Sequence, residues 1–503
     1  MKAVSLICKP VALALLVALG GCGSLLRSDY EPPMTQTPAA WTHGGSENLH
    51  APLAQGGQWW RNFNDPVLNG LIDAVLARNN DLAAAAIRVR RAQYQAGLTE
   101  DQLMPQLGGD ASVTRNRNLY GDRIITRNNQ AQLTVSYEVD LWGKLSRQRD
   151  AAQWEALATE QDRQSAALSL VGTTATLYWQ TAFINQRIAS SEESIAYARR
   201  TQDLVRAQYA AGGASALELA EAEQTVASQQ AAHTLLVQQR VEYTNALAIL
   251  FDGPPDRSMA NPLRLPPYPL PEARAGVPAD LLGRRPDLRA AELRLREALA
   301  TVDATRASFY PPVTLTGSVG SASPTLSNVL QNPVAALGVG LTLPFLRWNQ
   351  MQLNIKISKA DYEERVVNFR QTLYQAMADV ENALSNRTQL SLQAEQLAVS
   401  LRAARDAERL YEVRYRAGAV SLKDWLDAQE KRRSAEIARD ENGLNRLVNQ
   451  VTVYRALGGD DQAQNEAQTQ AETQIQTQVQ TQAQTQTQAQ TQTQARTKTQ
   501  PLP

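Results

Sequence analysis

The sequence of 503 residues contains very little cysteine and histidine. Its two cysteines, Cys8 and Cys22, both lie at the N-terminus, so the rest of the chain cannot hold a disulfide framework. The three histidines, His43, His50 and His233, are scattered, which argues against a histidine metal site. A P-loop and a nucleophile elbow are also missing. The sequence therefore predicts no enzyme, no metal site and no cofactor.

The chain also lacks an excess of charge and, beyond its N-terminus, a long apolar run. Its 50 basic and 50 acidic residues cancel, and no basic stripe stands out, so nucleic acid is not an expected partner. After residue 22 there is no stretch of about 18 apolar residues, the minimum for a transmembrane helix. If the protein crosses a bilayer, it must do so with strands.

The first residues have the pattern of a secretory signal. Two lysines precede an apolar run at residues 11–19, and Gly20 and Gly21 lead to Cys22. Residues 1–21 are therefore predicted to be a signal peptide. The four residues that end at Cys22 resemble the bacterial lipobox, which implies that Cys22 is lipidated and begins the mature chain. The next residue is glycine rather than aspartate, which by resemblance to sorted lipoproteins favours the outer membrane.

A long segment of the chain occurs twice. Pro105 is matched by Pro311 and Trp142 by Trp348, each 206 positions further on. A single offset without net insertion predicts a duplicated unit and an internal two-fold repeat. The expected organisation is a signal peptide (1–21), a lipidated extended leader (22–57), a first efflux repeat (58–253), a Pro-rich connector (254–284), a second efflux repeat (285–459) and a disordered Gln/Thr-rich tail (460–503).

Two strands are expected in each repeat. Apolar and polar residues alternate from Leu133 to Leu141, which is typical of a transmembrane barrel strand and equally of a half-buried soluble strand. Apolar positions of the other strands are Val339, Leu341, Leu343 and Phe345 in the equivalent strand, and Leu107, Ala111, Val113, Val313, Leu315 and Val319 in the preceding ones.

Very long helices are expected to follow the strands. Residues 145–208 and 351–414 contain no proline and only one glycine, Gly172, and each run would reach about 95 Å at 1.5 Å per residue. Narrow apolar stripes with charged outer faces predict antiparallel coiled-coil packing. Strands that lead directly into such helices favour a membrane duct over a purely structural coiled-coil lipoprotein.

Four strands in one chain predict an oligomer. An open sheet edge in lipid leaves unpaired backbone groups that cost several kcal/mol each, and the smallest closed bacterial barrels use about eight strands. Two chains would give a barrel filled by its own side chains, whereas three would give twelve strands around an aqueous lumen.

Four motifs in order carry a resemblance to the TolC superfamily of outer-membrane efflux proteins, especially its NodT-like and OprM-like lipoproteins, over roughly residues 40 to 460. They are Trp59–Pro66, Asp140–Gly143, Arg285–Asp287 and Ala456–Gly459. The resemblance implies a mixed α+β outer-membrane protein, lipid-anchored and homotrimeric. Its twelve-strand β-barrel would continue into a periplasmic α-helical barrel. It also implies two partners, a periplasmic adaptor and an inner-membrane pump of RND type or, alternatively, ABC type.

The same resemblance places a gate at the periplasmic turns of the helices. Two pore-facing carboxylates are carried over to Asp424 and Asp427, whose spacing puts them on one helix face, although solvated helix-start carboxylates would show the same spacing. Close like charges in such a ring are expected to raise the pKa of some members. Lys423 stands where OprM-like relatives have an aperture leucine.

A tyrosine latch is likewise carried over, to Tyr415 with Glu218 as its acidic partner. The arginine of the family's latch falls on Val420, so this part of the pattern is incomplete here.

These expectations describe a passive efflux channel for drugs or small solutes. The alternatives are an exit duct for type I protein secretion and a structural coiled-coil lipoprotein. The substrate cannot be predicted, because in such systems the pump selects it.

Overall fold

The structure is a computed structural model that describes part of the chain. The described residues are 27–44, 58–121, 125–254, 262–266, 270–271, 276–329, 331 and 333–459. The predicted signal peptide, the predicted lipidation site Cys22, half of the leader and the Gln/Thr-rich tail lie outside them.

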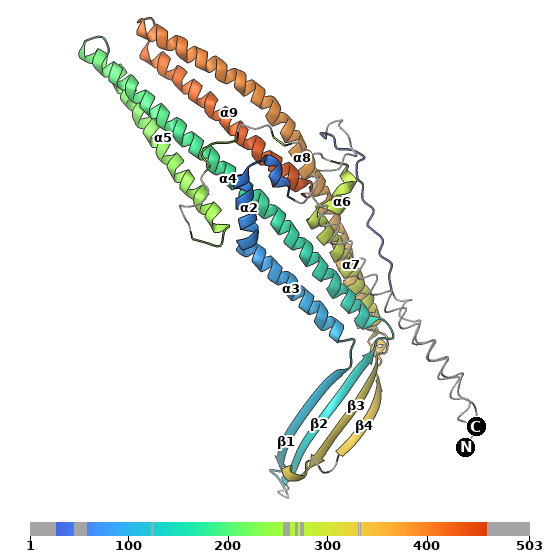
Figure 1. Cartoon of the computed structure of the whole chain (residues 1–503). Coiled ribbons are helices and arrows are strands. Elements are labelled where there is room, and N and C mark those ends of the chain that lie inside the picture. Colours follow the sequence, from blue (N-terminus) through green and yellow to red (C-terminus); the bar gives the residue numbers. More distant parts are fainter. Residues whose placement is uncertain are drawn as a thin grey trace. The chain divides into compact units, whose positions relative to one another are not determined.

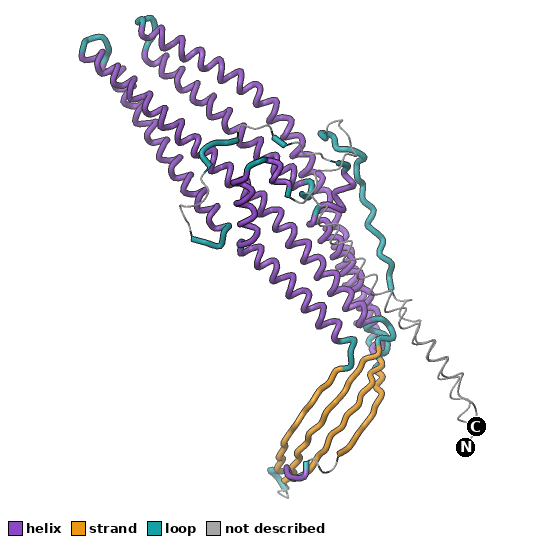
Figure 2. The backbone as a smooth tube through the Cα atoms, viewed as in Figure 1, coloured by secondary structure: helices purple, strands orange, loops and turns teal. Residues whose placement is uncertain are grey.

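The chain forms two compact units, and each draws on both predicted repeats. Unit 1 comprises Met1–Thr37, Asp81–Ala166 and Pro286–Gln375, and unit 2 comprises Pro38–Asn80, Ala167–Arg285 and Ala376–Pro503. The two longest helices, α4 (Lys144–Ala210) and α8 (Trp348–Arg416), contribute residues to both units. Helices dominate the fold, and all four strands belong to unit 1 (Figure 2).

Unit 1 contains one antiparallel sheet in the order β1-β2-β3-β4 (Figure 1). Its other elements are α3, α7, two short 3-10 helices and the first parts of α4 and α8. The bounds are α3 (Asn80–Asp101), β1 (Gln106–Arg117), β2 (Ile125–Val139), α7 (Pro286–Ala307), β3 (Val313–Ser323), η4 (Leu326–Asn328), β4 (Pro333–Leu341) and η5 (Pro344–Leu346).

The strand register confirms the predicted alternation. Leu133 of β2 lies opposite Val319 of β3, and Leu315 of β3 lies opposite Val339 of β4, so apolar side chains share one face. The apolar side chains of this face are exposed among the described residues, with Leu337 at 94%, whereas Asn129, Ser321 and Ser323 on the same face are buried at the end of the sheet far from α4.

Two strands end earlier than predicted. β4 stops at Leu341, so Leu343 and Phe345 are not strand residues. The following Pro344 has no N–H to donate and begins the short helix η5. β2 stops at Val139, and Leu141 is likewise outside the strand.

The motif after β2 joins the sheet to α4. The Asp140 carboxylate accepts hydrogen bonds from the N–H groups of Leu145 and Ser146 at 3.0 and 2.8 Å and so satisfies the helix start. The indole of Trp142 donates to the Pro311 carbonyl at 2.8 Å.

Unit 2 contains α2, α5, α6, α9, two short 3-10 helices and the remaining parts of α4 and α8. Its elements are η2 (Trp59–Phe63), α2 (Pro66–Arg78), α5 (Ala216–Ile249), η3 (Pro278–Asp280), α6 (Leu281–Arg284) and α9 (Leu422–Ala456). In its core, Trp59 of the first motif stacks on Tyr454, two residues before the last motif, with ring centroids 5.0 Å apart. A Cβ on Gly458 would lie 2.7 Å from the Arg284 carbonyl oxygen, which explains the glycine at that position.

No helix within the described residues combines the length and the apolarity needed to cross a membrane.

Candidate functional site

The candidate gate lies at the two helix turns of unit 2, one between α4 and α5 and the other between α8 and α9. Each turn contains a glycine in the left-handed conformation, Gly212 with φ 80° and Gly418 with φ 72°. A serine then caps each following helix. The two turns therefore share one construction.

Each cap is a reciprocal pair of hydrogen bonds. At the start of α9, the Ser421 hydroxyl accepts from the Asp424 N–H at 3.3 Å. In return, the Asp424 carboxylate accepts from the Ser421 N–H at 3.1 Å and from the Ser421 hydroxyl at 2.6 Å. Ser215 and Glu218 form the equivalent box at the start of α5.

The cap determines the ionisation of Asp424. Hydrogen bonds from the Ser421 side chain, and then from its backbone, hold the pKa of Asp424 below its usual range. Within one chain this direction is opposite to the rise expected from a ring of like charges, because the hydrogen bonds favour the charged carboxylate.

An aromatic cluster packs next to the two turns. Trp425 is 2% exposed and stacks on Tyr415, with ring centroids 5.2 Å apart and planes at 27°. Tyr197 of α4 meets the edge of Trp425 at 6.3 Å. Val420, at the latch-arginine position, packs against this cluster as an apolar contact.

Tyr415 links α8 to α4, but through a different partner than expected. Its hydroxyl donates a hydrogen bond to the Gln208 Oε1 atom at 2.9 Å. Glu218 instead bonds to Ser215 in its cap, with its carboxylate 2.7 Å from the Ser215 nitrogen. The Glu218 charge still acts on Tyr415, whose pKa is raised first by burial and then by that carboxylate.

Asp424 and Asp427 line a common groove between α8 and α9. Its volume is about 670 Å³. Both acids lie one turn apart on α9, as their spacing predicted, and Lys423 beside them is exposed without lining the groove. The full lining consists of Leu397, Ser400, Ala403, Ala404, Ala407, Tyr411, Asp424, Asp427, Ala428, Glu430, Lys431, Ser434, Ala435 and Ala438.

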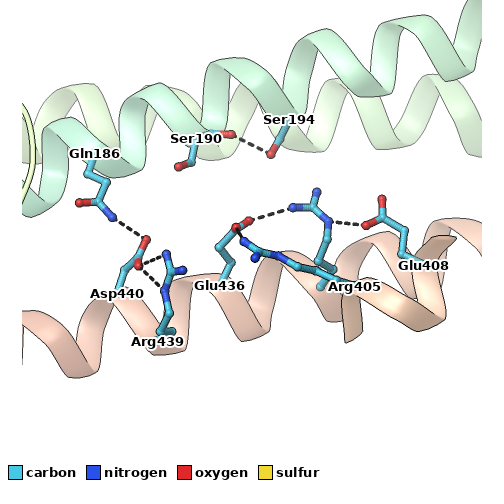
Figure 3. A network of polar contacts seen from close by, with 9 residues as sticks. Gln186, Ser190, Ser194, Arg405, Glu408, Glu436, Arg439 and Asp440 are labelled. Atoms are coloured by element: carbon cyan, nitrogen blue, oxygen red, sulfur yellow. Dashed lines mark hydrogen bonds and ion pairs between the residues drawn. The ribbon is translucent and has the colours of Figure 1, made fainter. Parts of the chain in front are cut away.

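Further along the same helices, a polar network joins α8, α9 and α4 (Figure 3). Arg432 of α9 pairs with Glu408 of α8 and, at 2.8 Å, with Glu436. Arg405 of α8 reaches the other Glu436 oxygen at 2.6 Å. Burial raises the pKa of Glu408, while the Arg432 charge opposes this rise. The network therefore fixes the two helices that border the groove.

Gln186 extends the connection to α4. Its amide donates to the Asp440 carboxylate at 2.8 Å, and the Arg439 Nε donates to the same carboxylate at 2.8 Å (Figure 3).

Sequence reasoning assigned no role in this region to Trp425, Arg432 or Lys431. Lys431 has a detectable signal, because it follows Asp424 and Asp427 by seven and four positions on the same helix face. Arg432 shows only its i,i+4 spacing to Glu436, while its contact with Glu408 and the contacts of Trp425 with Tyr415 and Tyr197 join different helices and leave no local signal. Within the described part of the chain, no group of His, Cys, Asp and Glu side chains could hold a metal ion.

Comparison with known proteins identifies the class. The outer membrane efflux protein family matches residues 71–251 and 277–459. The chain therefore belongs to this family and is an outer-membrane efflux channel protein whose helices extend into the periplasm.

Particular relatives cover most of the chain. The pyoverdine export outer membrane protein OpmQ of Pseudomonas putida is 33% identical over 457 residues, which are 88% of this chain and 96% of that protein. Toxin and drug export protein A of Aggregatibacter actinomycetemcomitans is 31% identical over 407 residues, 80% of this chain and 88% of that protein. The crystal structure of the CmeC outer membrane channel of Campylobacter jejuni superposes with a TM-score of 0.80 at 25% identity, covering 86% of this chain and 95% of that chain.

Proposed function

We propose that the protein is the outer-membrane exit duct of a tripartite efflux system. Three copies form a twelve-strand barrel that continues into a helical barrel, and a lipid on Cys22 adds an anchor. A periplasmic adaptor connects the duct to an inner-membrane pump of RND type, with an ABC-type pump as the other possibility. The cargo is a drug or another small solute, and the duct itself is passive.

The sheet is the observation that carries this proposal. Its apolar side chains share one exposed face, as a lipid-facing surface requires. Its edge strands β1 and β4 would leave unpaired backbone groups in lipid unless another copy paired with them. A ring of three sheets removes these edges and leaves room for an aqueous lumen.

The duplication supports the same architecture. Each predicted repeat contributes two strands, one very long helix and one shorter helix after a tight turn. The family matches the chain in two separate segments, residues 71–251 within the first predicted repeat and residues 277–459, which contain the second. A duplicated unit in three copies gives the helical tube six similar helical hairpins.

Asp424 and Asp427 form the proposed gate. In a trimer each aspartate becomes a ring of three, and two rings at a narrow mouth would attract cations and repel anions. The Tyr415–Gln208 hydrogen bond is the proposed latch, because it ties the α8–α9 hairpin to α4.

The relatives are named for export of pyoverdine and for export of toxins and drugs. We propose efflux of small solutes for this chain, with a duct for type I protein secretion as the alternative. Reconstitution in planar bilayers tests the channel: the purified trimer should produce defined conductance steps. A trimer without conductance would instead support a structural coiled-coil lipoprotein. Crosslinking in cells, with identification of the captured adaptor and pump, would establish the pump type.

A further inference from the structure

The strands carry only three basic residues within the part of the chain that the structure describes, and all three lie together. Arg115 and Arg117 end β1, and Arg127 lies near the start of β2. Arg115 is directly opposite Arg127, and Arg117 lies opposite Ile125. All three side chains are exposed. They cluster beside the β1–β2 connection, at the end of the sheet away from α3 and α4 (Figure 1).

These arginines share the apolar face of the sheet. Successive side chains in a strand alternate between the two faces, so Arg115 is on the same face as Leu107 and Val113. At the same level the opposite face carries only neutral polar side chains. These are Thr114, Asn116, Thr126 and Asn128. The positive charge therefore belongs to the surface that faces lipid in the proposed barrel.

Among the described residues, the cluster has no compensating charge. Like charges directly opposite each other on neighbouring strands are destabilising. Among the described residues, no acidic side chain forms an ion pair with any of the three arginines. A phosphate group would compensate them, because guanidinium groups bind its oxygens in a bidentate manner.

In the proposed barrel, the three arginines lie at the depth expected for a lipid head group. The apolar positions of β1 run from Leu107 to Val113, and Arg115 is the next side chain on that face. At about 3.3 Å per residue, this apolar run is about 20 Å long, close to the roughly 25 Å apolar band of a transmembrane barrel. A ligand that places acyl chains on Leu and Val and a phosphate on Arg is a phospholipid or a phosphorylated glycolipid.

We infer that Arg115, Arg117 and Arg127 bind the phosphorylated head group of an outer-leaflet lipid. The inference rests on the proposed membrane-spanning sheet, whose helical end faces the periplasm, so that the β1–β2 connection faces outward. Lipid held here would fix the sheet at a set depth and neutralise the paired arginines.

The test measures binding of purified bacterial lipopolysaccharide to the full-length, detergent-solubilised protein. Replacing all three arginines with glutamine should weaken binding about a hundred-fold, since each basic side chain near an anionic lipid surface contributes about five-fold. The three lysine replacements keep the charge but lose the bidentate geometry, so they should weaken binding less than the glutamine replacements do. Exchanging Arg115 with Thr114 and Arg127 with Thr126 keeps the composition but moves two charges to the other face, and it should weaken binding.

Two further probes distinguish lipid from a free anion. Lipopolysaccharide stripped of its phosphates should bind the parent as weakly as the intact lipid binds the glutamine variant. Inorganic phosphate alone should show no arginine-dependent binding. Glutamine-variant affinity within about two-fold of the parent, undiminished binding of the stripped lipid, or arginine-dependent binding of phosphate alone would each overturn the inference. The variants' trimer mass and conductance are measured in parallel, so a failure of the proposed channel is seen separately.

Discussion

At the scale of single residues, Tyr415 is placed to hold two helical hairpins together. Its ring stacks on Trp425 of its own hairpin, and its hydroxyl donates to Gln208 of the other. Glu218 is nearby, but its carboxylate is engaged in the cap of α5. The polar contact that can open without disturbing a helix start is therefore Tyr415–Gln208.

A double-mutant cycle separates the two partners. We expect Tyr415→Phe and Gln208→Leu to couple by about 1 kcal/mol, the net worth of one hydrogen bond. Coupling between Tyr415→Phe and Glu218→Gln should be close to zero at neutral pH, because the Glu218 charge acts on ionisation of the phenol rather than on the neutral side chain. The measurement is the local unfolding free energy of the tips from hydrogen exchange. A larger coupling to Glu218 would restore it as the latch partner.

The acidic groove makes a separate prediction about conduction. Asp427→Ala should raise single-channel conductance and reduce cation preference, since it removes three charges from the proposed mouth without touching the cap. Asp424→Ala should do the same and also loosen the start of α9. Lys423→Leu should shift selectivity toward cations.

Planar bilayer recordings with salt gradients provide the measurement. Asp203→Asn is the matched control, because Asp203 is exposed on α4 and lies outside the groove lining. If removal of both groove aspartates leaves conductance and selectivity unchanged, these residues are surface carboxylates and the gate lies elsewhere.

At the scale of elements, sequence periodicity predicted the strands and the long helices well. The 67 and 69 residues of α4 and α8 exceed the predicted runs by only a few residues at each end. The errors fell at strand ends, where alternation continued in the sequence past Leu341 although Pro344 could not pair. Periodicity shows which side chains share a face of an element, but it does not show where the backbone hydrogen bonds between strands end.

The candidate site was predictable only in part, because periodicity shows which residues share a face of one helix but not which residues meet between helices. Asp424 and Asp427 share a face of one helix, and helical spacing alone reveals this. The contacts of Arg432 with Glu408 and of Trp425 with Tyr197 join different helices. Such contacts depend on how the helices align, which local patterns do not contain.

The α8–α9 pair has a predicted pH dependence. Burial raises the pKa of Glu408 in the folded state, so the folded protein holds this proton at a pH where the unfolded chain has lost it. This contribution to stability is complete below the unfolded pKa and disappears as pH rises through the folded one. The measurement is the slope of unfolding free energy against pH above about pH 4. Glu408→Gln should remove the fall in unfolding free energy that comes from loss of the Glu408 proton. Asp406→Asn, at an exposed site on the same helix, is the control for removal of an acid from α8.

At the scale of the whole molecule, two features depend on more than the folded chain. One is the lipid anchor. Cys22→Ser should abolish labelling with a palmitate analogue and slow signal removal, because the thiol is the proposed attachment point. Unchanged labelling would show that the lipid is absent or attached elsewhere. The variant can still reach the membrane, since the proposed membrane-spanning sheet would anchor the protein independently.

The other feature is the number of chains. A four-stranded sheet with the edges β1 and β4 needs partners in lipid, so the native mass of the detergent-solubilised protein should equal three chains. Deleting residues 462–503 should leave this mass and the conductance unchanged, because the Gln/Thr-rich tail has too few apolar residues to bury a core. Loss of the trimer on deletion would assign the tail a role in assembly. A stable monomer that keeps the circular dichroism of its strands would contradict the barrel itself, because its sheet would then be stable with both edges unpaired.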